Sequence, residues 1–347
     1  MPHKNTSRRA ALAALASLSA LVLLPLGARA QGGDLPAAVP PGAKLVVADQ
    51  NEALQTLMRA SGEHGKLTAG VSYANFVGGP AILEAFRAGA VDLAVVGNTP
   101  PIQAHAAGEE IPIVAARRNA APDYFFAVRP GLTVATLQEF KGKKIAYGIG
   151  TGRQPYVLTA LKLAGLTKRD VTLVPLRASE FDTAVRTGQV DLASLIEPNF
   201  SRYLRDFADQ KASALPASEH ARLPTKLSYL YASKAALNDP AKAAAIREFV
   251  GAWIRASYWS VKNPDPWVDA YYVRNRKLQR EDGIAIVKSE GDVSFPALAD
   301  SIAGQQELID LIHEAGDLPR RLDARQEFDL RFDPVIREAV AAVQAGK

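Results

Sequence analysis

The sequence AFRAGAVDLA at residues 85–94 recurs as AVRTGQVDLA at residues 184–193, and this pair decides the fold class. In each copy the pattern predicts a helix that ends at an arginine, a glycine in the left-handed conformation, and a strand that begins at Val-Asp-Leu-Ala. A second pair, KLVVA at 44–48 and KIAYG at 144–148, lies upstream with nearly the same offset. Helix-glycine-strand junctions are common, but agreement at two places favours a repeat over chance. We therefore expect two α/β units of similar topology that face each other across a ligand-binding cleft.

Asp92 and Asp191 occupy matching positions in the repeat. Each opens a strand, at the end opposite the loops that would form a cleft. We therefore expect both to support turns rather than to bind a ligand.

Residues 1–30 have the pattern of a cleaved signal peptide. Lys4, Arg8 and Arg9 precede a mostly apolar stretch, and Ala28-Arg29-Ala30 is a small-residue cleavage site. Ser7-Arg8-Arg9 also resembles a twin-arginine signal, so both the Sec and the twin-arginine export routes stay open. A membrane anchor is the alternative, and the cleavage site argues against it.

The composition of the exported chain excludes several classes of function. Without the signal peptide, 37 of the 41 basic residues remain against 36 acidic ones, so there is no basic footprint for nucleic acid. The absence of cysteine excludes disulfides, thiolate metal sites, a cysteine nucleophile and a lipidated N-terminal cysteine. We expect a freely soluble protein of the periplasm.

The length of the exported chain predicts two lobes. The 317 residues after position 30 exceed what one hydrophobic core usually serves. We expect a flexible leader at 31–43, lobe 1 at 44–127 and 229–347, and lobe 2 at 128–228. The chain would cross between the lobes twice, which places a hinge near 127–131 and 224–232.

Motifs that would indicate an enzyme are absent from the sequence. There is no G-x-S-x-G, H-E-x-x-H or G-x-x-x-x-G-K-[ST] motif, and the five histidines are scattered. We expect no catalytic residues, no bound metal and no cofactor.

One glycine-rich loop is a candidate anion site. Residues 148–152 (GIGTG) follow a predicted strand and precede a predicted helix, with a spacing that does not fit the dinucleotide fingerprint. Free backbone N–H groups and the helix dipole favour an anion at such a position. Thr151, Arg153 and Gln154 could add side-chain donors, and a plain tight turn is the alternative.

Several ordered sequence words resemble the aliphatic-sulfonate-binding proteins of ABC importers, within a wider group that includes nitrate, taurine and thiamine-precursor binders. The matching words are FVGGP at 76–80, GNTPP at 97–101, AAG at 106–108, TLQEFKGKK at 136–144 and AGDLPRRLD at 315–323. The resemblance covers nearly all of residues 44–325. Each motif alone is only moderately specific for the family, whereas the order and spacing of the motifs are strongly specific.

The resemblance implies a two-lobed type II periplasmic-binding-protein fold that closes on its ligand and delivers it to an ABC permease at the inner membrane. By analogy the ligand-facing positions are Gln50, Gly78, Gly79, Asn98, Thr99, Thr151 and Glu197. The sequence departs from the family at Gly150–Gln154 and at Ile196, and Glu197 beside an anion would need a cation such as Arg153 or Arg177.

The leading interpretation is a receptor for a small organic anion, an aliphatic sulfonate, that acts as a monomer. Nitrate, taurine and pyrimidine-type ligands remain alternatives. Two further readings are an enzyme on the same fold, which the missing cysteine disfavours, and a sensory receptor without its own importer.

Overall fold

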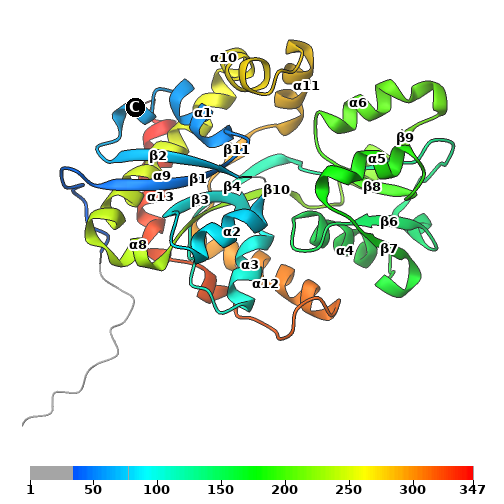
Figure 1. Cartoon of the computed structure of the whole chain (residues 1–347), viewed down its shortest axis with the longest axis horizontal. Coiled ribbons are helices and arrows are strands. Elements are labelled where there is room, and N and C mark those ends of the chain that lie inside the picture. Colours follow the sequence, from blue (N-terminus) through cyan, green and yellow to red (C-terminus); the bar gives the residue numbers. More distant parts are fainter. Residues whose placement is uncertain (1–33, 77, 347) are drawn as a thin grey trace, which may run out of the picture. The chain divides into compact units, whose positions relative to one another are not determined.

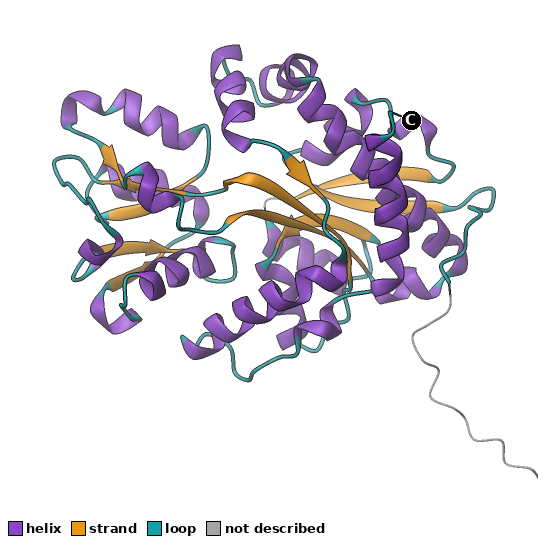
Figure 2. Cartoon of the chain, turned by 180° about the vertical axis from the view of Figure 1, so that it is seen from behind, coloured by secondary structure: helices purple, strands orange, loops and turns teal. Residues whose placement is uncertain are grey.

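The structure is a computed structural model that describes residues 34–76 and 78–346. The predicted signal peptide and the first three residues of the leader lie outside the described residues. Residues 34–347 form one compact unit. Figure 1 shows two β-sheets side by side within this unit, and Figure 2 shows helices packed on both faces of the larger sheet.

The first sheet has six strands in the order β11-β4-β10-β3-β1-β2. Strand β1 pairs in parallel with β2 and β3, whereas β10 runs antiparallel between β3 and β4. The strands are β1 (Lys44–Gln50), β2 (Gly70–Phe76), β3 (Leu93–Gly97), β4 (Ile113–Pro122), β10 (Thr225–Ala232) and β11 (Val293–Ser294).

The second sheet has five strands in the order β7-β6-β8-β5-β9. Strand β6 pairs in parallel with β7 and β8, and β5 runs antiparallel to β8. The strands are β5 (Phe125–Val128), β6 (Lys144–Tyr147), β7 (Thr172–Pro175), β8 (Leu192–Leu195) and β9 (Ser213–Ala214). Both sheets thus contain three parallel strands bordered by one antiparallel strand, which confirms the repeat predicted from the sequence.

The two repeated junctions have the predicted conformation. Helix α2 (Gly79–Arg87) and helix α5 (Phe181–Arg186) both end at the repeated arginine. Gly89 and Gly188 follow with φ of 64° and 73°, which a residue with a side chain adopts only at a steric cost. The glycine therefore ends the helix and turns the chain into β3 or β8.

The remaining helices are arranged around the two sheets. They are α1 (Ala53–Ala60), α3 (Thr99–Ala106), α4 (Arg153–Leu163), α6 (Asn199–Asp206), α7 (Ala217–His220), α8 (Lys234–Asn238), α9 (Pro240–Lys262), α10 (Pro264–Trp267), α11 (Arg280–Glu290), α12 (Leu298–Glu314) and α13 (Asp333–Gln344), with a π-helical segment at Val268–Asn275. None of the helices in the described part of the chain has the length and apolar character needed to cross a membrane.

Helix α12 joins the cores of the two sheets. Leu298 at its start belongs to the core around the first sheet, whereas Ile309 and Ile312 near its end pack with Phe126 and α4 in the core of the second sheet. Part of the segment 229–347 therefore packs against the second lobe, because the last turns of α12 turn apolar residues toward α4. The lobe boundaries stay a prediction.

Candidate functional site

A cavity of about 960 Å³ is lined by residues that follow strands of both sheets. Its walls include the carboxyl ends of β1 and β3 and the start of α2 on one side. The opposite side is formed by the 149–153 loop, the start of α4 and the 176–179 loop. The two segments that connect the sheets, around Asp123 and Lys226, also line it. The cavity thus lies where two facing α/β lobes are expected to bind a ligand.

The carboxyl end of β1 is fixed by a buried aspartate. Asp49 is 2% exposed, and its carboxylate accepts hydrogen bonds from the backbone N–H groups of Gln50, Leu54 and Gln55 at 2.7–2.9 Å. Burial raises the pKa of Asp49, and the three N–H groups oppose that shift. Asp49 therefore caps α1 and holds Gln50 against the cavity, where Gln50 Nε2 also donates to Val95 O at 3.3 Å.

The start of α2 reaches the cavity because two glycines allow a close approach. Gly78 has φ of 90°, in the region that favours glycine. A Cβ on Gly79 would lie 2.9 Å from Pro100 Cγ in the first turn of α3. The N-termini of α2 and α3 therefore pack together at the cavity wall. The Gly-Gly-Pro sequence at 78–80 and the Thr-Pro-Pro sequence at 99–101 form this contact.

Arg153 at the start of α4 is the best-placed cation of the second lobe. Its guanidinium carbon lies 5.1 Å from the centroid of the Tyr124 ring and 5.2 Å from that of Phe181, and its Nε donates to Ser194 O at 3.2 Å. Within the described chain its two terminal nitrogens make no hydrogen bond or ion pair. The stacked rings hold the guanidinium in place with those donors still available to a ligand.

Gly152 allows this arrangement. A Cβ at that position would overlap the Tyr124 hydroxyl. Glycine therefore lets the loop before α4 pack directly against the aromatic ring that holds Arg153.

The cavity is lined by most, but not all, of the residues that the sequence singled out. Those that line it are Gln50, Gly78, Gly79, Asn98, Thr151 and Arg153. The hydroxyl of Thr151 donates to Gly148 O at 2.7 Å, so it closes its own turn. Thr99, Gln154 and Glu197 are not among the lining residues, and each has a local partner.

Local hydrogen bonds explain the positions of these three residues. Thr99 is completely buried in the first turn of α3, and its hydroxyl donates to Asn98 Oδ1 at 3.4 Å. Gln154, also completely buried, accepts from Gly150 N at 2.8 Å and donates to Asp317 at 2.9 Å. Glu197 accepts from the hydroxyl of Ser201 at 2.9 Å and from its N–H at 3.2 Å, which caps α6. The lining residues next to Glu197 are Ile196 and Asn199.

The sequence analysis did not predict several residues that line the cavity. Arg117 and Lys226 lie on the two strands that lead between the lobes, and Tyr124 lies between those strands in the chain. Ile149 is 61% exposed and Ile196 is 38% exposed, although large apolar residues are usually buried, and both line the cavity. Arg117 could have been recognised in the sequence, because a charged residue follows the apolar run of a predicted strand there.

The charges that line the cavity favour an anion. The lining cations are Arg117, Arg153, Arg177, Lys226 and Arg276, and the lining acids are Asp49, Asp123 and Asp182. Of the cations, Arg177 pairs with Glu180 at 2.7 Å, and Lys226 pairs with Glu290 at 3.0 Å and with Asp123 at 3.4 Å.

Lys226 stays positively charged. Burial alone would lower the pKa of Lys226, but Glu290 and Asp123 together raise it above the ordinary value. Arg117, Arg153 and Arg276 have no salt-bridge partner among residues 34–76 and 78–346.

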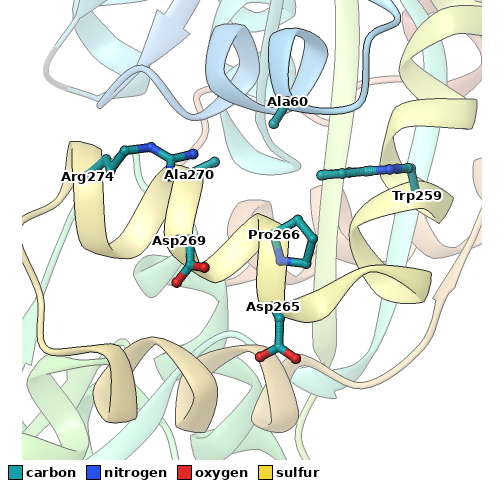
Figure 3. Close-up of a pocket in the computed structure, with 7 residues that line it drawn as sticks. All are labelled: Ala60, Trp259, Asp265, Pro266, Asp269, Ala270 and Arg274. Carbon is teal, nitrogen blue, oxygen red and sulfur yellow. The ribbon is translucent and has the colours of Figure 1, made fainter.

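A second hollow of about 450 Å³ lies beside α1 and α9, and Figure 3 shows its seven lining residues. Its two carboxylates, Asp265 and Asp269, are both bound by Arg280, at 2.6 and 3.0 Å. None of the sequence-predicted residues lies there. No group of three or more His, Asp or Glu that could hold a metal ion occurs among the residues that the structure describes.

Comparisons with known proteins identify the family and the fold. The family model described as NMT1/THI5 like matches residues 75–266. Two relatives carry the name "Putative aliphatic sulfonates-binding protein". The one from Escherichia coli (strain K12) is 31% identical over 134 residues, which is 39% of this chain and only 42% of that protein. The one from Bacillus subtilis (strain 168) is 24% identical over 262 residues, 76% of this chain and 77% of that protein.

The fold also matches a solved structure. The alkanesulfonate-binding protein SsuA from Xanthomonas axonopodis pv. citri, bound to MOPS, superposes with a TM-score of 0.71 at 23% identity. The superposition covers 83% of this chain and 99% of that one. The two-lobed fold expected from the sequence is thereby confirmed.

Proposed function

The chain belongs to the NMT1/THI5-like family, and from that premise we propose that it is the substrate-binding protein of an ABC importer for a small organic anion, an aliphatic sulfonate. Both relatives carry the name "Putative aliphatic sulfonates-binding protein", and the solved neighbour holds MOPS, which is a sulfonate. The ligand would be delivered to a permease at the inner membrane.

The observation that carries the proposal is the position of Arg153. Arg153 lines the same cavity as the start of α2, and the rings of Tyr124 and Phe181 hold its guanidinium. A planar guanidinium binds an oxyanion with two parallel hydrogen bonds. The neighbouring start of α4 adds the positive end of a helix dipole, whereas the N–H groups of Gly150, Arg153 and Gln154 are engaged within the loop.

The size and lining of the cavity favour an organic anion over nitrate. A volume of about 960 Å³ far exceeds that of nitrate. Its apolar members include Tyr124, Ile149 and Ile196, which can cover the carbon chain of a ligand. Closure of the two lobes would then bury that chain and exclude water from the ion pair.

We place the protein in the periplasm as a monomer that acts without catalysis and without a cofactor. The relatives' functions and the predicted signal peptide support that location. The chain holds no cysteine, so an enzyme on this fold that needs a thiol nucleophile has no candidate residue here.

Thermal-shift titration of the purified protein tests the proposal. The panel contains alkanesulfonates, taurine, aromatic sulfonates, nitrate and sulfate. A ligand at about one hundred times its dissociation constant stabilises the folded protein by about 2.7 kcal/mol, so a sulfonate should raise the melting temperature clearly. A response to nitrate alone, or to no member of the panel, would overturn the sulfonate assignment.

A further inference from the structure

Arg117 on β4 is, with Arg153 and the exposed Arg276, one of three lining cations that have no salt-bridge partner in the described chain. It lies opposite Ser228 of β10 and lines the cavity. Its Nε is buried and has no hydrogen-bond partner in the described chain, and its terminal nitrogens make no hydrogen bond or ion pair there either. Burial lowers the pKa of this guanidinium, because desolvation disfavours its charged form. An unsatisfied buried donor of this kind calls for an acceptor.

The nearby carboxylates are already engaged by another side chain. Lys226 Nζ lies 3.0 Å from Glu290 and 3.4 Å from Asp123. Glu290 favours the charged form of Arg117 through space, but no oxygen of Glu290 lies within ion-pair distance of it. Arg117 therefore keeps its hydrogen-bond donors for a group that enters the cavity.

Arg117 and Arg153 come from different lobes and line one cavity. Arg117 stands on a strand of the first sheet, whereas Arg153 begins α4 beside the second sheet. Apolar residues also line the cavity, including Tyr156, Leu195 and Leu227. The cavity thus offers two guanidinium groups without a salt-bridge partner in the described chain, one from each lobe, together with apolar surface.

We propose that the ligand is an organic dianion, whose sulfonate binds Arg153 and whose second acidic group, a carboxylate, binds Arg117. This inference rests on the proposed function and narrows its substrate class. A carboxylate matches the forked donors of a guanidinium and supplies the negative charge that desolvation of Arg117 demands. A monoanionic sulfonate bound to Arg153 would leave the Arg117 donors unsatisfied.

Two pairs of probes isolate the second acidic group, because within each pair a carboxylate replaces a methyl group. They are 1-propanesulfonate with 3-sulfopropanoate, and p-toluenesulfonate with 4-sulfobenzoate, which differ in length. Isothermal titration calorimetry of the wild-type protein should show the dianion of at least one pair binding about tenfold or more tighter than its monoanion. Equal or weaker binding of both dianions, with sulfonate binding intact, would overturn this inference alone. Binding of none of the four probes would overturn the proposed function instead.

Variants assign the preference to Arg117. Arg117→Gln should remove the dianion preference, so that the dianion and the monoanion of the responsive pair bind with affinities within about threefold of each other. Arg118→Gln is the matched control, because Arg118 is the next residue of β4, is exposed and does not line the cavity. Persistence of the preference in Arg117→Gln would place the second group elsewhere. The wild-type comparison already decides the ligand class if the variant fails to fold.

Discussion

Asp92 and Asp191 make the same hydrogen bond in the two halves of the fold. Asp92 Oδ2 accepts from Val46 N and Asp191 Oδ2 accepts from Lys144 N, each at 2.9 Å. The other oxygen of each aspartate accepts from a basic side chain at 2.7 Å. Neither aspartate lines the cavity, and each joins the start of its strand to a neighbouring strand and a basic side chain rather than supporting a turn. Val47 pairs with Leu93 and Ile145 pairs with Leu192, so the structure shifts the predicted alignment of 44–48 with 144–148 by two residues.

Removing one of these carboxylates should destabilise the protein. Asp191→Ala deprives Lys144 N and Arg129 Nε of their acceptor, and an unpaired, partly buried donor costs about 1–3 kcal/mol. We expect the free energy of unfolding, measured by urea denaturation, to fall by about that amount. Asp209→Ala should change it by less than about 0.5 kcal/mol, because Asp209 is exposed and makes no hydrogen bond within the described chain. Equal stability of the two variants would contradict the structural role of Asp191.

Replacing the guanidinium of Arg153 should weaken sulfonate binding. Arg153→Gln removes a charge-assisted contact, and such hydrogen bonds contribute about 1.5–3 kcal/mol, or roughly 10- to 100-fold in affinity. Arg186→Gln is the control, since Arg186 also lies over a ring, 5.4 Å from the centroid of Phe207, but outside the cavity. Calorimetric titration should show the loss in Arg153→Gln only. A similar affinity in both variants would remove Arg153 from the site.

The contact between α2 and α3 should be sensitive to a single methyl group. Gly79→Ala places a Cβ 2.9 Å from Pro100 Cγ, so one helix must shift, at a cost of about 1–3 kcal/mol. We expect lower thermal stability together with weaker sulfonate binding. Gly304→Ala on α12 meets no atom within 4 Å and should leave binding unchanged. Destabilisation of Gly79→Ala with unaltered affinity would show that the start of α2 does not contact the ligand.

His220 should make the stability depend on pH. Its Nε2 accepts a hydrogen bond from Phe126 N at 2.8 Å, and burial lowers the pKa of His220 to about 4. The folded state therefore holds the neutral ring, whereas the unfolded chain takes up a proton below pH 6.5. This contribution to stability is complete above pH 6.5 and is lost as the pH falls to about 4, up to about 3 kcal/mol.

The matched variant for this prediction is His220→Gln, whose amide oxygen can accept the same hydrogen bond without titrating. Urea denaturation at several pH values should show the wild type losing its advantage over the variant between pH 6.5 and 4. Parallel stability curves for the two proteins would contradict the titration of His220.

Much of the fold was predictable because it repeats. The helix-glycine-strand junctions at 85–94 and 184–193 predicted β3 and β8. The packing of Ile309 and Ile312 against the second lobe was not predicted. The spacing of apolar residues identifies the buried face of a helix. It does not tell which of the two hydrophobic cores that face packs against.

The site was only partly predictable. Positions set by the backbone, such as Gly79 and the start of α4, follow from the ends of strands and helices. A polar side chain that caps a helix and one that binds a ligand have the same sequence pattern, so Glu197 could not be told from a ligand residue. Arg117 and Tyr124 became visible only when the strands that connect the lobes were placed along the cavity.

The most direct test of the account compares 1-butanesulfonate with 1-butanesulfonamide, which share their carbon chain but differ in charge. We predict that calorimetric titration of the purified protein gives measurable binding of the sulfonate and affinity for the neutral sulfonamide lower by about tenfold or more, because the cavity offers unpaired guanidinium groups. Equal affinity for the two compounds, or no binding of the sulfonate, would contradict the account of an organic-anion receptor.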